Sequence, residues 1–200
     1  MAAKDAKLDH PVNDLVASRW SPYAFADRGV SEADLRSLFE AARWAPSSYN
    51  EQPWSYIVAR REEPAEFARL LSCLVEGNQA WARAVPVLAL GVTTLLFRRN
   101  GRPNRAAQHD LGLASGNICV EATARGLRVH QMIGILPDRA RELYAIPEGS
   151  EALTGIAIGY LAPPAGVPDA LRQRDEVPRT RKPLHEFVFH GAWARPAPFA

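Results

Sequence analysis

The chain has 200 residues, of which 47% are apolar and 23% charged, so it fits a single compact domain with a substantial core. Its 24 basic and 22 acidic residues are interspersed and leave a formal net charge of +2, which argues against a nucleic-acid partner. The two cysteines, Cys73 and Cys119, lie in apolar stretches and do not form a disulfide framework. Residues 1–10 lack the apolar run of a secretory signal, and the longest apolar stretch, residues 85–97, is shorter than the ~20 residues of a membrane span. We therefore expect a cytoplasmic protein with no membrane partner.

Helical and strand patterns alternate from the start of the chain. A short helix is predicted over residues 12–17. Ser31 followed by Asp34 is typical of a helix N-cap, and the apolar spacing that follows predicts a helix that ends before Pro46. Residues 54–59 alternate and are rich in aromatic and β-branched side chains, so they are predicted to form a strand.

The middle of the chain continues this alternation. Pro64 suits the first turn of a helix that is predicted to close at Gly77. Residues 86–94 are predicted to form a buried strand. A long helix is then expected over residues 106–125, with Gly126 as its stop.

Two further strands, over residues 127–133 and 153–161, complete a predicted set of four, with a short helix over residues 138–144 between them. No strand-to-helix connection carries a G-x-G-x-x-G turn, so a Rossmann dinucleotide site is not predicted. Seven of the 16 prolines fall between residues 163 and 198, which predicts an extended C-terminal arm over residues 162–200.

The most distinctive motif is Ala-Pro-Ser-Ser-Tyr-Asn-Glu-Gln-Pro-Trp at residues 45–54, between a predicted helix and a predicted strand. Its hydrogen-bonding side chains are Ser47, Ser48, Asn50 and Gln52. By itself, the motif is interpreted slightly more readily as an ordinary turn. Because Trp44 and Trp54 flank it, the loop also suits a ligand that is part polyol and part flat heteroaromatic ring.

Two other segments could bind a charged ligand. Residues 18–25 offer Arg19, Ser21 and three aromatic side chains, although the segment could equally be a capping loop. Arg179 and Arg181 stand at i and i+2 in a proline-rich segment, so in an extended chain they would project to the same side and could hold a phosphate dianion. For this pair alone, a solvated basic tail is the better interpretation.

Together these segments resemble the FMN-dependent nitroreductase family over residues 15–187. Residues 19–25 resemble the family's opening Arg/Ser-rich segment that ends in Phe, and residues 45–54 match its Ala-Pro-Ser-Ser-x-Asn-x-Gln-Pro-Trp motif at every fixed position. The resemblance implies an α+β fold in one domain, residues 1–200, with a central mixed or antiparallel sheet of about four to five strands flanked by helices. It also implies a C-terminal arm exchanged between subunits.

The resemblance further implies a homodimer with FMN at the subunit interface. Arg19 and Ser21 would serve the phosphate and ribityl end, Arg179 and Arg181 the phosphate, and Asn78 the polar edge of the flavin. The main chain at residues 132–134 would approach its reactive nitrogen, and the loop at residues 46–50 would come from the partner. The residues implied to bind the cofactor are Arg19, Trp20, Ser21, Tyr23, Pro46, Ser47, Ser48, Asn50, Gln52, Asn78, Ile133, Gly134, Arg179 and Arg181.

The implied activity is a ping-pong transfer of electrons from NADH or NADPH to a nitroaromatic, quinone or related acceptor. Because the flavin itself accepts and releases hydride, no catalytic side chain is predicted. Two alternatives stay open: another redox reaction in the same fold, such as dehydrogenation of a metabolite or destruction of the flavin, and a non-enzymatic basic binding protein.

The chain departs from the family pattern at Trp20, Tyr23 and Trp81, where many relatives carry basic residues. Tyr23 and Trp81 would either stack on substrate or belong to the core. The Arg- and Asn-rich residues 95–108 are predicted to form a lid over the substrate pocket. The five histidines include no i, i+4 helical pair and no H-E-x-x-H, so no metal site is predicted. Without a G-x-S-x-G motif, hydrolase chemistry is not expected either.

Overall fold

The computed structural model describes residue 4 and residues 6–200. Its centre is one antiparallel sheet in the order β1-β2-β4-β3, which confirms the α+β class. The strands are β1 (Trp54–Arg60), β2 (Val87–Thr94), β3 (Leu127–Met132) and β4 (Ser150–Tyr160). Within this part of the chain no helix is long and apolar enough to cross a membrane.

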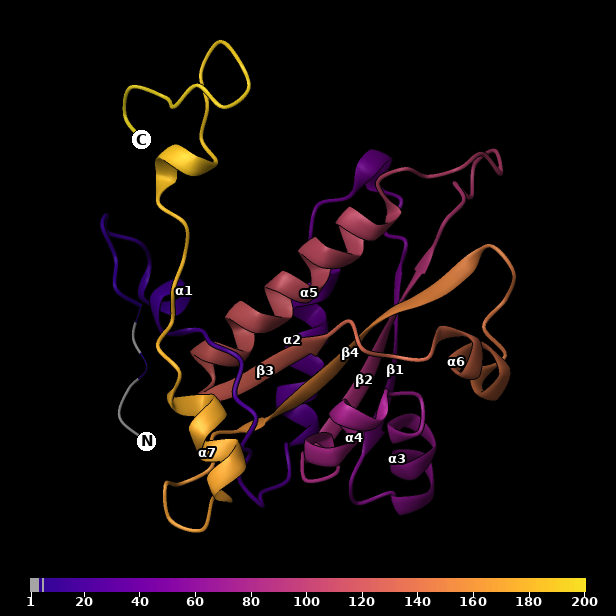
Figure 1. Cartoon of the computed structure of the whole chain (residues 1–200). Coiled ribbons are helices and arrows are strands. Elements are labelled where there is room, and N and C mark those ends of the chain that lie inside the picture. Colours follow the sequence, from indigo (N-terminus) through magenta and orange to yellow (C-terminus); the bar gives the residue numbers. More distant parts are fainter. Residues whose placement is uncertain (1–3, 5) are drawn as a thin grey trace.

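Helices α2 (Glu32–Arg43) and α5 (Ala107–Ala124) cover one face of the sheet, and Figure 1 shows α5 running diagonally across it. Val87 and Ala89 of β2 pack on this side, where Leu38 and Ile118 are fully buried. The predicted N-cap of α2 is confirmed, because the Ser31 side chain accepts a hydrogen bond from the main-chain nitrogen of Asp34. β2 is therefore buried on both faces, as its apolar run predicts.

The other face is covered by α3 (Pro64–Leu71), α4 (Glu76–Ala82) and α6 (Pro137–Tyr144). The helix predicted from Pro64 to Gly77 is wrong in extent, because it is two helices and Gly77 lies inside the second. The reason is tertiary: Leu74 leaves the helix to form an antiparallel bridge with Ile135, and the chain restarts as α4 afterwards. By contrast, Gly126 has a φ of +71° and ends α5 as predicted.

The N-terminal helix α1 (Asp14–Ser18) begins after Asn13, whose side chain accepts from the main-chain nitrogen of Leu15. This cap places the start two residues later than the apolar pattern indicates. β4 begins at Ser150, three residues before the predicted strand, because Thr94 and Ser150 extend the β2–β4 ladder.

The predicted arm over residues 162–200 is not extended throughout. It contains α7 (Asp169–Glu176), which the sequence analysis missed, and the short 3-10 turn η2 (Leu184–Glu186). The buried carboxylate of Asp175 accepts from the main-chain nitrogens of Tyr23 (2.8 Å) and Ala24 (3.0 Å), and so fixes α7 to the N-terminal segment. Beyond α7 the chain is extended, passes beside α1 and ends in a loop that stands clear of the sheet (Figure 1).

Candidate functional site

The loop at residues 47–52 is held in a conformation that few side chains adopt. Tyr49, Asn50 and Gln52 have φ values of 54°, 55° and 50°. Outside glycine, such a conformation costs on the order of 1 kcal/mol per residue, so the surroundings must hold it in place. The main-chain nitrogen of Gln52 donates to Ser47 Oγ (3.0 Å), and that of Ser48 donates to Asp110 Oδ2 (3.0 Å). The loop is thus an anchored structure and more than a local turn.

Asp110 is a residue of this region that the sequence analysis did not place in the site. It lies in the first turn of α5, is 2% exposed, and also contacts His109 Nδ1 at 3.2 Å. The side chain of His109 is 71% exposed, as expected for a surface histidine. An acidic residue in the first turn of a helix is common because it complements the helix dipole, so the sequence held no special signal for its second role.

The two tryptophans that flank the motif have different environments. Trp44 is exposed and its Nε1 donates to Glu40 Oε1, while Trp54 packs against the buried cluster between α2, α5 and the sheet. Asn50 and Gln52 share a surface hollow with Trp44. Of the two tryptophans that flank the motif, only Trp44 is therefore exposed enough to contact a ligand.

A second group of predicted residues lies where the N-terminal segment meets α5 and β3. Arg19 Nη1 donates to Ser21 Oγ at 3.4 Å. Gln131 of β3 reaches across to Cys119 of α5, with Nε2 donating to Sγ at 3.2 Å. Burial raises the pKa of the Cys119 thiol, and the nearby positive charge of Arg19 opposes that rise. Arg19 therefore lies beside the C-terminal half of α5.

The aromatic departures from the family pattern are core residues. Trp20 is 5% exposed and Trp81 is 3% exposed. Tyr23, Trp81 and His130 form a cluster with ring centroids 4.6–5.2 Å apart. Of the two alternatives for Tyr23 and Trp81, Trp81 lies in the core, and Tyr23 is half-buried against it.

Asn78 and Gly134 are brought into direct contact. Asn78 Nδ2 donates to the Gly134 carbonyl oxygen at 2.9 Å, and the main-chain nitrogen of Val75 donates to the same oxygen at 3.1 Å. A Cβ atom on Gly134 would lie 2.6 Å from Asn78 Nδ2 and 2.9 Å from Val75 Cγ2, so no other residue fits without movement. The adjacent Ile133 is 77% exposed, which leaves this piece of main chain at the surface.

The two C-terminal arginines, Arg179 and Arg181, make different contacts. Arg179 Nη1 donates to the carbonyl oxygens of Lys4 (2.9 Å) and Ala17 (2.5 Å). These bonds place Arg179 at the C-terminal end of α1, which Arg19 follows directly in the sequence. Arg181 is exposed and donates to the carbonyl oxygen of Thr180. Both arginines line one small hollow together with Lys7 and Lys182. The predicted pair therefore shares a basic hollow, although Arg179 also ties down the N-terminal segment.

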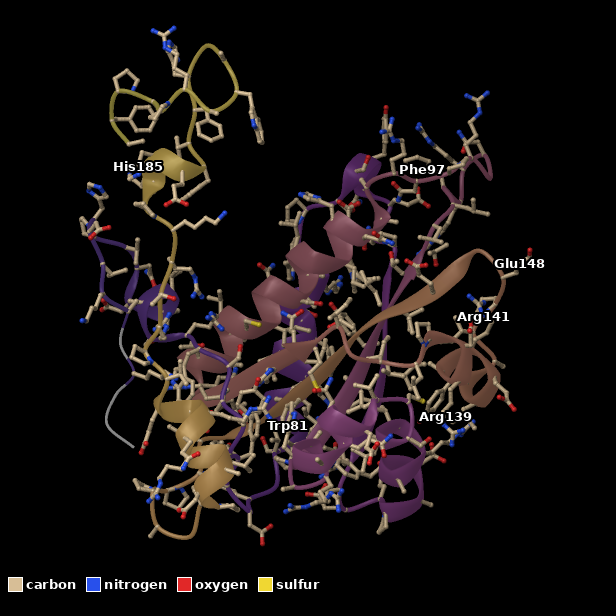
Figure 2. The ribbon with its side chains drawn as sticks, viewed as in Figure 1. Trp81, Phe97, Arg139, Arg141, Glu148 and His185 are labelled. Carbon is tan, nitrogen blue, oxygen red and sulfur yellow. The ribbon has the colours of Figure 1, made fainter. Side chains whose placement is uncertain are left out.

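The predicted residues thus form two groups at different places on one chain. The loop at residues 47–52 contacts α5 at Asp110, whereas Arg19 lies near Cys119 on the same helix. Nine residues of α-helix span about 14 Å. Figure 2 shows Phe97 near the N-terminal end of α5 and Trp81, a residue of α4, far from that end. No group of three or more His, Cys, Asp or Glu side chains able to hold a metal ion occurs in the part of the chain that the structure describes.

Comparisons with known proteins agree with this architecture. Residues 16–160 match the model of the nitroreductase family. A crystal structure described as an oxidoreductase containing FMN superposes with a TM-score of 0.88 at 32% identity, covering 96% of this chain and 98% of that one. A Methanothermobacter thermautotrophicus protein is 30% identical over 83% of this chain and 84% of its own length. Its name assigns it as an NADH dehydrogenase/NAD(P)H nitroreductase, an activity that the name does not claim to be demonstrated. An uncharacterised 15.4 kDa Mycolicibacterium smegmatis protein is 31% identical over 65% of this chain and 86% of its own.

The chain combines an α+β fold, built on an antiparallel sheet, with an anchored loop in the motif at residues 45–54. Taken with these similarities, this combination defines an oxidoreductase. More particularly, the chain belongs to the nitroreductase family.

Proposed function

We propose that the protein is an FMN-dependent NAD(P)H oxidoreductase that reduces nitroaromatic, quinone or related small acceptors in a ping-pong cycle. The observation that carries the proposal is the loop at residues 47–52, which presents its polar groups in a strained conformation that is anchored on α5. Strained main chain that persists because its surroundings hold it is characteristic of ligand-binding sites. The 32% identical oxidoreductase contains FMN, and the M. thermautotrophicus relative is named for NAD(P)H.

The residues present fit FMN. Arg19 and the arginine-lined hollow offer cations for a phosphate, and Ser21, Ser48 and Asn50 offer hydroxyl and amide groups for a polyol. The main chain beside the exposed Ile133 is open to a ligand, so a flat ring can approach it there. Bound FMN would supply the hydride chemistry. The chain itself would bind the phosphate, orient the ring and exclude water.

We also propose a homodimer in which each FMN site uses both subunits. Because the loop at residues 47–52 and the Arg19 region lie about 14 Å apart along α5, they suit the two sides of a shared site better than one continuous pocket. The arm adds a second reason. Phe187, Trp193 and Phe199 are 57%, 89% and 77% exposed, and such apolar surface on a projecting segment is expected to pack on a partner. A reduced-nicotinamide donor is available inside cells, so we place the protein in the cytoplasm.

Anaerobic titration of the FMN-loaded protein with NADH and then NADPH tests the activity. Bleaching of the visible flavin band by a donor, reversed by a nitroaromatic or quinone, is the expected result. A bound flavin that neither donor bleaches would favour another redox reaction. Failure to bind FMN at all would remove the enzyme proposal.

Mixing two inactive variants tests the shared site. Asn50→Ala damages the loop group and Gly134→Val damages the other group. If a site takes its loop from the partner, each mixed dimer contains one intact site and one doubly damaged site, so FMN retention returns on mixing. If both groups belong to one subunit, no mixture regains FMN. Light scattering should give twice the chain mass of 22.0 kDa.

A further inference from the structure

Residues 95–105, between β2 and α5, form a rigid hairpin that carries four arginines and is here called the arginine hairpin. Phe97 and Arg102 are joined by a main-chain hydrogen bond of 2.8 Å, and Asn104 donates to the Leu95 carbonyl oxygen at 2.7 Å. Gly101, with a φ of +66°, closes the turn. Most of the segment predicted to be a lid, residues 95–108, therefore folds as a hydrogen-bonded hairpin.

The charges of the arginine hairpin are largely unneutralised. Arg98, Arg99, Arg102 and Arg105 are all exposed. Arg98 reaches Glu51 at 4.0 Å, but within the described part of the chain the other three make no ion pair. Some arginines elsewhere are neutralised locally: Arg36, for example, pairs with a carboxylate one turn away on its own helix. Four like charges within eight residues repel one another, so their clustering favours binding of an anion.

The arginine hairpin is also fixed to the loop at residues 47–52. Glu51 Oε1 accepts from the main-chain nitrogen of Arg98 at 2.6 Å, and the Glu51 side chain is 9% exposed. On the outer side, the Arg99 guanidinium lies 4.0 Å from the Tyr49 ring centroid, and the Tyr49 and Phe97 rings meet edge to face at 5.8 Å. Tyr49 itself is 73% exposed. The result is an edge-to-face pair of aromatic rings with the Arg99 guanidinium over the Tyr49 ring, and further cations lie nearby in the hairpin.

We propose that the arginine hairpin selects NADPH over NADH by binding the phosphate on the adenosine ribose. This inference rests on the proposed function, in which the loop at residues 47–52 borders the flavin of the partner subunit, and the arginine hairpin is bonded to that loop. A phosphate monoester carries close to two negative charges near pH 7. Guanidinium groups bind it through paired, charge-assisted hydrogen bonds, and the exposed Tyr49 ring offers an apolar surface for a flat base beside it.

An anionic acceptor, such as a carboxylated nitroaromatic, presents similar chemistry to the same cations. The two sources differ in where the phosphate or carboxylate sits. The donor carries its phosphate on a ribose remote from the hydride, whereas a small acceptor carries its charge on the reacting molecule. The arginine hairpin carries its cations outside the loop at residues 47–52, which favours a ligand whose charge lies remote from the reacting group.

Arg99→Ala/Arg102→Ala tests the proposal. We expect the KM for NADPH to rise by up to roughly a hundred-fold, about ten-fold for each arginine lost, while the KM for NADH stays unchanged. The control is Arg36→Ala/Arg172→Ala, which removes two exposed arginines that are ion-paired on their own helices. Equal losses with both donors would overturn donor selection. A loss confined to a carboxylated acceptor, with no change for a neutral one, would assign the arginine hairpin to the acceptor instead.

A binding measurement separates this inference from the proposed function. Calorimetry compares ADP-ribose with its 2′-phosphorylated form, and neither probe undergoes redox chemistry. Tighter binding of the phosphorylated probe, lost in the double variant, supports the selection. Equal binding of the two probes by an enzyme that NADH reduces overturns the selection and leaves the reductase function standing. If neither donor reduces the flavin, the proposed function fails, and donor selection fails with it.

Discussion

The main-chain nitrogen of Ser48 donates to Asp110 Oδ2 at 3.0 Å, and this bond joins the loop at residues 47–52 to the first turn of α5 across 62 sequence positions. The carboxylate is 2% exposed, so water cannot replace it. It thereby holds a loop that contains three residues with positive φ. The geometry of the loop depends on a residue outside the motif.

Removal of this anchor should weaken both stability and cofactor binding. Asp110→Ala leaves the Ser48 N–H without its acceptor, which costs about 1–3 kcal/mol in the free energy of unfolding. We expect FMN affinity to fall at least in proportion, and equilibrium dialysis measures it. Asp110→Asn keeps an acceptor oxygen and should lose less. Glu121→Ala, which removes a solvent-accessible acid from the same helix, serves as the control, and an effect as large there would contradict the anchoring role.

Much of this arrangement follows from local sequence signals. Ser31 and Asp34 predict the start of α2, Gly126 predicts the end of α5, and the motif at residues 45–54 locates the loop. These signals work because caps, positive φ and turn chemistry are set by a few adjacent residues. The α+β class and the family were also predicted correctly, by resemblance, while the choice between a mixed and an antiparallel sheet was left open.

The features that were missed depend on contacts between distant segments. The break between α3 and α4 arises from the bridge of Leu74 to Ile135, and α7 is held by the bonds from Asp175 to residues 23 and 24. Local propensity contains no record of either partner. Likewise, the burial of Trp20 and Trp81 is decided by the tertiary core, so their side chains could not be assigned to ligand or interior from spacing alone.

Gly134→Ala should disrupt the contact with Asn78. The added methyl group would lie 2.6 Å from Asn78 Nδ2, so the hydrogen bond to the Gly134 carbonyl must lengthen or the main chain must shift. We expect a stability loss of about 1–3 kcal/mol, as for overpacking, together with weaker FMN binding. Gly77→Ala is a matched control, because nothing lies within 4 Å of its Cβ position and it is helical. That change should be neutral or stabilising by up to about 1 kcal/mol in urea unfolding.

Asp175→Ala should release α7 from the N-terminal segment. Its carboxylate accepts from two main-chain nitrogens. Without this buried acceptor, the free energy of unfolding should fall by on the order of 2–3 kcal/mol. Hydrogen exchange should accelerate at Tyr23 and Ala24, and protease cleavage should increase near α7. Asp169→Ala lies on the same helix, is 78% exposed and pairs only with Arg172, so it should cost less than about 0.5 kcal/mol. Similar exchange in both variants would show that Asp175 does not hold this junction.

His130 should make the protein less stable in mild acid. Burial lowers the pKa of the His130 imidazole below the ordinary 6.5. The hydrogen bond between Nδ1 and the Pro22 carbonyl oxygen and the charge of Asp175 raise this pKa, but by less. The charge of Arg174 lowers it further. Between the folded and unfolded pKa values the unfolded chain binds more protons. The contribution of His130 to stability is therefore complete above pH 6.5 and is lost as the pH falls below it.

Urea unfolding at pH 7.5 and at pH 5.5 measures this loss, with both values bracketing the ordinary pKa of 6.5. One proton gives a slope of at most about 1.4 kcal/mol per pH unit, and His130→Phe should reduce the slope of the parent by part of that amount. His185→Gln replaces an exposed histidine of the arm and should leave the slope as it is. A parent slope that survives in His130→Phe would assign the acid sensitivity to other groups, and the Tyr23–Trp81–His130 cluster would then have no part in it.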